Sequence, residues 1–418
     1  MIQSRHAAAE SPGVRLDQGS RVAICGAGCA GLSAAVELVA RVHGIHISIF
    51  DAAMGPAHDK TWCSWSVRPH RFASAVSKSW DRVRVRGGGY DTTIEASRYS
   101  YTCIRARDFF DQADRMLKGS CQIEWSSRVQ HVNERDDAVE LTISDSTGAE
   151  RTAEFDIVLD GRTVTRAALL GSAGGETSEP RLVQHFGGLE VEVPRGTVDP
   201  NIAVLMDFDV DQGSGIHFMY ALPLSEESVL VESTLLTPPG YAPVDYASNA
   251  FAYIEREFGV SSPTVTYREA GALPMTLSRL GPASSRRVWT IGTRAGIGRA
   301  SSGYAFDAIQ RDSARIVSAL AAGEPRPGSP RSRFLSMLDR VLLSWLTTNP
   351  SVAPQIFGRL FARCPTESLI RFLADEPTAA DLWNAMWAMP KLRTAVHASL
   401  HTTAWPRLSV PLVPSGTR

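Results

Sequence analysis

The sequence lacks the features of several protein classes. Its 43 basic and 44 acidic residues give a formal net charge of -1 without long runs of one sign, which argues against a broad surface for nucleic acid. The six cysteines form no pair of Cys-x-x-Cys motifs, and the first residues include no apolar signal segment, so we expect no structural zinc or other metal site and a cytoplasmic location. No apolar run approaches the ~18 to 20 residues of a membrane span. The sequence therefore predicts a soluble or peripheral protein.

A glycine-rich turn lies between two apolar segments near the start of the chain. "RVAIC" is typical of a buried strand, "LSAAVELVARV" of a helix, and "HISIFD" of a second strand. Gly26, Gly28 and Gly31 have the GxGxxG spacing, and Asp51 follows 20 residues after the last of them. In such a unit the glycines permit a tight turn, close approach of a pyrophosphate and close helix packing, while the acid binds a ribose hydroxyl. The pattern predicts an adenine dinucleotide site.

The motif does not separate FAD from NAD. A second strand followed by a glycine-rich loop, near 291–303, favours FAD, because flavoproteins typically wrap two segments around one large cofactor. In this loop Gly292, Gly296, Gly298 and Gly303 are candidates to hold the flavin through backbone N–H groups. A tight turn that binds no ligand would use glycine in the same way.

The order of predicted elements indicates an α/β (α+β) fold. We expect a disordered lead-in at 1–20 and a discontinuous Rossmann-like FAD-binding domain at 21–175 and 285–325. A β-rich substrate domain is predicted at 176–284. A helical C-terminal region is predicted at 326–418, after a linker rich in Pro, Arg and Ser.

An ordered series of motifs resembles the bacterial lycopene cyclases. It includes "DKTWCSW" (59–65), "LVQHFGG" (182–188), "EAGALPMT" (269–276) and "IGTRAGIGRASSGYAFDAIQR" (291–311). The resemblance implies a flavoprotein-like fold, an FAD cofactor and a lipophilic isoprenoid polyene as substrate. It also implies that Glu232 matches the acidic residue essential for cyclisation.

One departure concerns the substrate. The family usually places an acid after its Thr-Trp-Cys-x-Trp segment, whereas this chain has Ser66 there and Ser64 where an aromatic residue is common. A cyclase acting on another terminal isoprenoid is therefore an alternative. The sequence also leaves open an FAD monooxygenase acting on a lipophilic substrate, and a carotenoid-binding protein without catalysis.

Glu232 interrupts a strand that is apolar on both faces. In "VLVESTLL" it shares one face with Leu230 and Leu236. Cyclisation of a lycopene-like end group starts with protonation of an alkene, which requires an acid that stays protonated, and burial would raise the pKa of Glu232 accordingly. The alternative is a structural ion pair with an arginine at a sheet edge.

Two further titratable residues are candidates with weaker support. Glu269 is interpreted as a second acid or base that removes the final proton, or as half of an ion pair with Arg268 or another basic residue. His185, among apolar residues, is more typical of a hydrogen-bonded core histidine than of a proton shuttle.

Aromatic rings can stabilise a carbocation in a dry cavity. Trp62, Trp65, Phe218 and Tyr220 are therefore candidates for the substrate-binding walls, and ordinary core packing is the alternative for each ring. Trp62 and Trp65 are favoured because we expect them in a loop after the dinucleotide unit.

The expected reaction leaves the oxidation level of the hydrocarbon unchanged, so reduced FAD is expected to act electrostatically. A polyene substrate is stored in the bilayer, which predicts a peripheral association with the inner face of the cell membrane. The apolar stripe from Phe334 to Trp345 is one candidate for this contact, and an internal core helix is the alternative. The sequence does not indicate an oligomeric state.

Overall fold

The computed structural model describes residues 13–163, 181–213, 215–240 and 244–389. The predicted lead-in therefore lies outside the described residues up to position 12. From there the prediction of disorder is wrong, because Val14 and Leu16 are buried and the Leu16 N–H donates to the carbonyl of Leu320 (3.1 Å).

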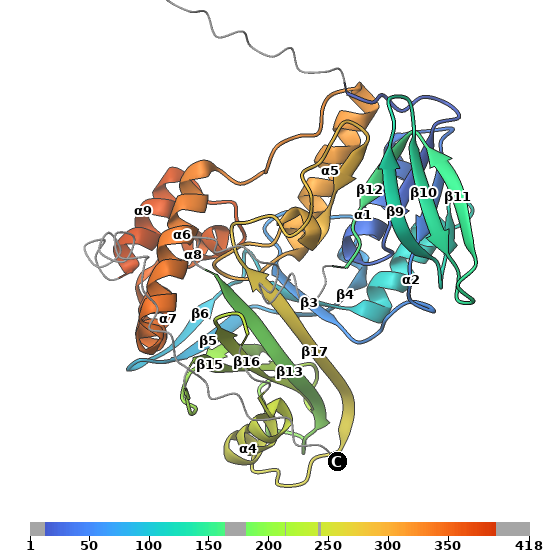
Figure 1. Cartoon of the computed structure of the whole chain (residues 1–418). Helices are drawn as coiled ribbons and strands as arrows, with labels where there is room; N and C mark the ends of the chain where they lie inside the picture. The colour runs from blue at the N-terminus through green and yellow to red at the C-terminus, as the bar shows by residue number, and fades with distance from the viewer. Residues whose placement is uncertain (1–12, 164–180, 214, 241–243, 390–418) are drawn as a thin grey trace, which may run out of the picture.

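A parallel five-stranded sheet lies at the upper right in Figure 1. Its order is β18 (Val288–Thr290), β12 (Ile157–Asp160), β1 (Arg21–Cys25), β2 (His46–Phe50) and β8 (Gln122–Glu124). Apart from the edge strand β8, these strands are largely apolar and buried, as expected for a parallel sheet covered on both faces.

Two layers cover this sheet. On one face pack α1 (Cys29–Arg41) and α5 (Phe306–Ala322), which contact each other. On the other lies a small antiparallel sheet of β9 (Arg128–Glu134), β10 (Val139–Ser144) and β11 (Glu150–Phe155). The predicted βαβ unit and the helix after the second glycine segment are confirmed.

A seven-stranded sheet forms the second large element. Its order is β17 (Val265–Met275), β13 (Leu182–Glu192), β16 (Ser228–Thr237), β15 (Ile216–Pro223), β14 (Ile202–Asp207), β5 (Arg82–Gly87) and β6 (Tyr90–Glu95). Because β14 pairs in parallel with β5, segment 82–95 joins this sheet. The boundaries predicted for the nucleotide-binding domain, which included that segment in 21–175, are wrong at this point.

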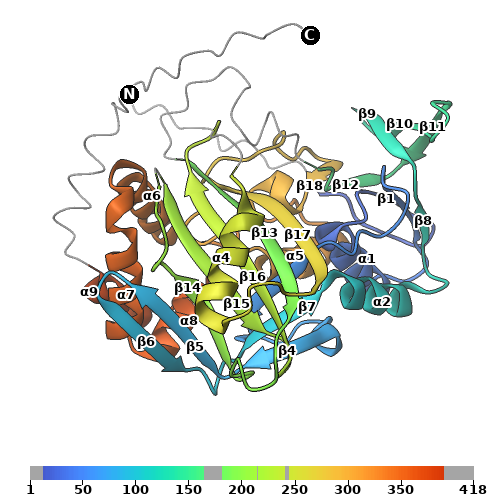
Figure 2. The same ribbon diagram turned by 90° about the horizontal axis from the view of Figure 1, so that it is seen from below.

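Helix α4 (Tyr246–Phe258) lies across one face of this sheet, as Figure 2 shows. A second three-stranded sheet contains β3 (Thr61–Trp65), β7 (Tyr101–Arg105) and β4 (Val76–Trp80), and α2 (Ala106–Leu117) follows β7.

Four helices follow in the described part of the C-terminal region, as predicted: α6 (Arg333–Thr348), α7 (Ala353–Arg363), α8 (Thr366–Leu373) and α9 (Ala379–Ala388). Most of the apolar stripe of α6 points inward: Trp345 is buried, and Leu338 and Leu342 pack in the core. Phe334 (45%) and Met337 (48%), near the start of the helix, are exposed. Among the described residues, no helix combines the length and the apolar character that crossing a membrane requires.

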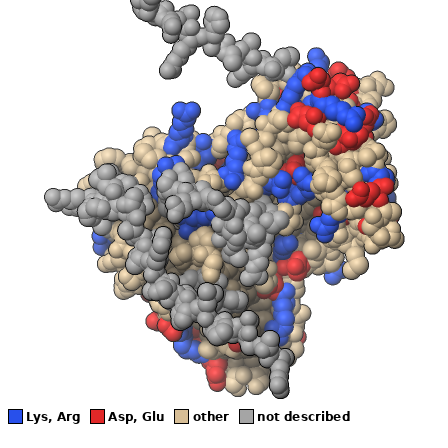
Figure 3. Space-filling model, in the orientation of Figure 1, with Lys and Arg blue, Asp and Glu red and all other residues tan. Residues whose placement is uncertain are grey.

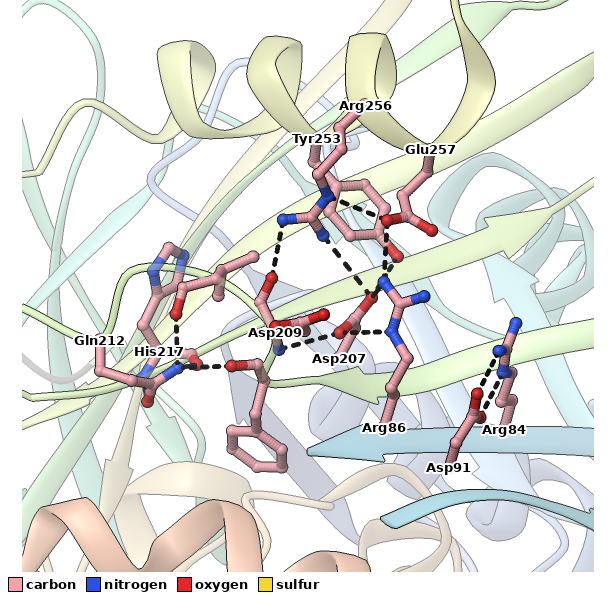
Figure 4. A network of polar contacts seen from close by, with 12 residues as sticks. Arg84, Arg86, Asp91, Asp207, Asp209, Gln212, His217, Tyr253, Arg256 and Glu257 are labelled. Carbon is pink, nitrogen blue, oxygen red and sulfur yellow. Dashed lines mark hydrogen bonds and ion pairs between the residues drawn. The ribbon is translucent and has the colours of Figure 1, made fainter. Parts of the chain in front are cut away.

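Acidic and basic side chains are interspersed on the face shown in Figure 3. One such group is partly buried and joins α4 to the large sheet (Figure 4). Asp207, 1% exposed, accepts hydrogen bonds from Arg86 and from the hydroxyl of Tyr253 (2.9 Å), and Glu257 of α4 also accepts from Arg86 (2.8 Å). This network holds α4 against one face of the large sheet, and the opposite face lines a cavity.

Candidate active site

A cavity of about 630 Å³ lies where the parallel sheet, the large sheet and the C-terminal helices meet. One end contacts the glycine-rich turn that follows β1. The large sheet contributes mostly apolar side chains: Leu205, Met206, Phe218, Leu230, Thr234 and Leu236. The C-terminal helices contribute Leu342, Phe357, Leu360, Phe361, Phe372 and Leu373. The cavity therefore has two parts: an end at the glycine-rich turn, and a largely apolar chamber lined by the large sheet and the C-terminal helices.

The glycine turn fits a dinucleotide. A Cβ atom at Gly31 would lie 1.9 Å from the carbonyl oxygen of Gly26, so close helix packing requires glycine there. At Gly28, by contrast, an added Cβ would meet nothing within 4 Å. Helix α1 begins directly after Gly28 without a side-chain cap, so its first N–H groups are open to a pyrophosphate at the cavity end.

Asp51 also lines this end of the cavity. Its carboxylate accepts hydrogen bonds from the backbone N–H groups of Ala27 (2.7 Å) and Ala53 (2.8 Å). Each oxygen retains acceptor capacity for a ribose hydroxyl. Gly26, Gly28, Gly31 and Asp51 are thus brought together as predicted, in an arrangement that suits an adenine dinucleotide.

The second glycine segment divides into two groups. Gly292 (φ +61°) and Gly303 (φ +72°) line the cavity, and a Cβ at Gly292 would lie 2.6 Å from the Cβ of Ala30 in α1. Gly296 and Gly298 are not among the lining residues. Gly296 (φ +73°) ends the short 3-10 turn η2 (Gly292–Ala295), which accounts for this glycine by backbone conformation alone.

Glu232 projects into the apolar chamber. As strand alternation predicts, Leu230, Thr234 and Leu236 line the cavity on the same face of β16. Val229 and Val231, on the opposite face, pack against the core beneath α4. Glu232 lies in the interior of the sheet, so the alternative of an ion pair at a sheet edge does not apply to it.

A row of directly paired residues crosses four strands at this point. Tyr220 of β15 pairs with Glu232, which pairs with Gly188 of β13, which in turn pairs with Glu269 of β17. Burial and the neighbouring Glu269 carboxyl raise the pKa of Glu232 well above its usual range. This environment favours the protonated form of Glu232.

Glu269 lies behind Glu232 and is not among the cavity-lining residues. It is 7% exposed, its Oε2 accepts a hydrogen bond from the hydroxyl of Tyr267 (3.2 Å), and burial raises its pKa as well. Arg268 points to the opposite, exposed face of β17, so the predicted ion pair between Arg268 and Glu269 is not formed. Direct removal of the final proton from a substrate in the cavity does not suit this position.

Three of the four aromatic residues predicted to form the substrate-binding walls line the cavity, and one does not. Phe218, Tyr220 and Trp62 line the cavity, and Trp62 packs edge-to-face on Phe109 with ring centroids 5.0 Å apart. Trp65 is 1% exposed and does not line this cavity. The reason is that both tryptophans lie in a strand, β3, and residues three apart in a strand point to opposite faces.

Two tyrosines of the site were not predicted. Tyr101 and Tyr304 line the cavity beside Tyr220, and the three hydroxyl groups contact one another. Burial raises the pKa of Tyr220 well above its usual range, so its hydroxyl remains neutral. Tyr304 follows Gly303 in a segment that already indicated cofactor binding, which was the available signal for it. No local pattern distinguishes Tyr101.

His185 lies outside the site. Its ring nitrogens hydrogen bond with the hydroxyls of Tyr246 (2.7 Å) and Thr237 (2.8 Å), and burial lowers its pKa. This arrangement fits the predicted core histidine. Ser64 is buried without lining the main cavity and Ser66 is exposed, so the departure at these positions does not alter the chamber wall.

Comparison with known proteins agrees with this geometry. The profile of the family described as "Lycopene cyclase protein" matches residues 21–399. The chain belongs to the lycopene cyclase family. It is 26% identical over 406 residues to a lycopene beta-cyclase of Paracoccus sp. (strain N81106 / MBIC 01143), covering 89% of this chain and 94% of the relative. A lycopene beta-cyclase of Pantoea ananas is 26% identical over 377 residues, covering 86% and 91%.

Among solved structures, a flavoprotein/dehydrogenase of Cytophaga hutchinsonii resembles this lycopene cyclase family member with a TM-score of 0.62. The match covers 92% of this chain and 99% of that one at 14% sequence identity. The fold is therefore that of flavoproteins with a Rossmann-like parallel sheet, and the chain is an enzyme of the lycopene cyclase kind.

Proposed function

We propose that this protein cyclises the end groups of a linear isoprenoid polyene, lycopene to a β-ring carotenoid, without net redox change. The observation that carries the proposal is a single acid, Glu232, projecting into an otherwise largely apolar chamber that opens toward a dinucleotide site. The two lycopene beta-cyclase relatives support the same substrate class.

The proposed chemistry begins at Glu232. Its proton is transferred to a terminal alkene carbon, and the neighbouring double bond attacks the resulting cation to close the ring. Return of a ring proton to the Glu232 carboxylate then restores both an alkene and the acid. Substrate and product then have the same formula. The raised pKa of Glu232 keeps the proton on the acid until the substrate arrives.

The cation needs stabilisation in a site without water. The rings of Trp62, Phe218 and Tyr220 line the chamber, and each ring face is worth about 0.5–2 kcal/mol toward a cation. Reduced FAD, when bound, would supply negative charge close to the developing cation. The residues that would hold it are the glycine turn, Asp51 and the backbone at Gly292 and Gly303.

Peripheral attachment to a membrane is proposed on a surface different from the predicted stripe of α6. Trp383 and Trp387 of α9 are 63% and 77% exposed and stack with ring centroids 6.1 Å apart. Paired exposed indoles are typical of groups that enter the interfacial region of a bilayer. Such an attachment would bring the apolar chamber near its bilayer-dissolved substrate.

Expression in a lycopene-accumulating host, followed by pigment chromatography, tests the proposed activity. Conversion of lycopene to ringed products is expected. The same reaction in D2O with chemically reduced flavin should add one deuterium per ring without consuming NADPH. Oxygen incorporation or stoichiometric NADPH loss would instead identify a monooxygenase, and tight polyene binding without turnover would identify a binding protein.

A further inference from the structure

A glycine separates two glutamates in the row that crosses the large sheet. Gly188 of β13 pairs with Glu232 on one side and with Glu269 on the other. A Cβ atom at this position would lie 2.8 Å from the Cγ of Glu232 and 3.2 Å from the Cγ of Glu269. Both side chains therefore converge on the space above Gly188 that any other residue would fill.

Among the described residues, no ion pair is formed by Glu269, and the nearby guanidinium of Arg105 is paired with Glu190. Arg268 is on the exposed face of the strand, and Oε1 of Glu269 is buried without a hydrogen bond from a conventional donor. Besides the effect of burial, the two carboxyl groups also shift each other's pKa: Glu269 raises the pKa of Glu232, and Glu232 lowers that of Glu269. A carboxylate is an acceptor only, so a bond between the two groups requires that one of them holds a proton.

We propose that Glu269 is a positioning residue that shares one proton with Glu232 across Gly188, so that Glu232 presents a protonated carboxyl group to the cavity. This proposal rests on the proposed role of Glu232 as the acid. Only Glu232 lines the cavity, so Glu269 acts through it.

Other titratable and charged groups surround the pair. They are Cys63 of β3, Cys103 and Arg105 of β7, Tyr220 of β15, Glu190 of β13 and Tyr267 of β17. Arg105 pairs with Glu190, donates to the hydroxyl of Thr61 (3.1 Å) and lies over the ring of Tyr267 (4.6 Å). Because Glu190 already offsets the charge of Arg105, one proton on the glutamate pair still leaves a net negative charge behind the chamber.

In the proposed reaction this negative charge would keep the proton on Glu232 and then stabilise the substrate cation. With Glu269 ionised, Glu232 retains its proton at neutral pH, since two adjacent carboxylates repel each other. When the proton moves to the substrate, the cation forms opposite two negative carboxylates.

The pH dependence of cyclisation in the flavin-loaded enzyme tests the proposal. In Glu269→Gln the negative neighbour is lost, so the pKa of Glu232 falls and the high-pH limit of activity should move down by about one pH unit or more. Gly188→Ala should shift the limit in the same direction, because the added methyl group separates the carboxyls while keeping both. Glu192→Gln, an exposed glutamate at the end of β13, is the matched control and should leave the limit unchanged.

Infrared titration of the protonated-carboxyl C=O band gives a readout without substrate. The band should persist to a higher pH in the wild type than in Glu269→Gln, Glu232→Gln or Gly188→Ala. Unchanged bands and unchanged pH limits in Glu269→Gln and Gly188→Ala would overturn the shared proton. If the band shifts as expected but no polyene is cyclised, the glutamate pair stands and the proposed function fails.

Discussion

Replacing Glu232 by glutamine preserves the size of the side chain but removes its transferable proton. Loss of a positioned general acid typically costs about 10²- to 10⁴-fold in rate, which corresponds to about 3–5 kcal/mol in the activation free energy. We expect Glu232→Gln to lose cyclase activity to at least this extent. Flavin binding should be unaffected, because Glu232 and the glycine turn lie on separate sheets.

The same substitution should alter how stability depends on pH. Glu232 has a higher pKa in the folded protein than the ~4.3 expected when unfolded, so the folded state binds more protons between these two values. The free energy of unfolding therefore decreases as pH rises through that interval, by up to about 1.4 kcal/mol per pH unit for one proton, and is level above it. In Glu232→Gln this contribution disappears, and the variant should gain stability relative to the wild type as pH rises.

Urea unfolding between pH 4 and 9 and product analysis with reduced flavin are the two assays. Glu140→Gln, on the small sheet β9–β11, is a control that should change neither. A Glu232→Gln enzyme that cyclises lycopene at near wild-type rates would refute the acid role. A stability difference from wild type that is independent of pH would refute the raised pKa.

Further substitutions test three separate parts of the molecule. Gly28→Val should fold but fail to bind FAD, because its side chain would enter open cavity space; flavin absorbance of the purified protein is the measurement, and full absorbance would contradict the site. Asp207→Asn should lower the free energy of unfolding by about 3 kcal/mol, as it breaks a buried ion pair, whereas Asp91→Asn, in the exposed pair with Arg84, should cost less than about 1 kcal/mol. Replacing Trp383 and Trp387 by serine should weaken vesicle binding more than about tenfold, since burying roughly 100 Å² of ring surface is worth about 2.5 kcal/mol; unchanged co-sedimentation would contradict this surface.

Local pattern was sufficient for the features that depend on a few neighbouring residues. Alternation in "VLVESTLL" placed Glu232 with Leu230 and Leu236, and the structure has that arrangement. The glycine spacing located the dinucleotide turn for the same reason. Helix α4 was missed although its signals were present: Asp245 caps its first turn and Gly259, with φ +67°, ends it.

Local sequence patterns could not predict features that depend on how distant strands pair. Glu269 follows Glu232 by 37 positions, and only the register of β13 against both β16 and β17 brings the two carboxyls over Gly188. A shift of either strand by one residue would turn its glutamate to the opposite face. Single-sequence periodicity carries no information about that register.

The position of Glu232 in the interior of a seven-stranded sheet bears on how such an acid is controlled. Its backbone is fixed by strands on both sides, so the carboxyl has less freedom to move toward water when it ionises than a group on a loop would have. The energetic cost of ionising the carboxyl at this position appears as a raised pKa. On the proposed mechanism, Gly188 and Glu269, which do not line the cavity, help to set the protonation state of Glu232, which does.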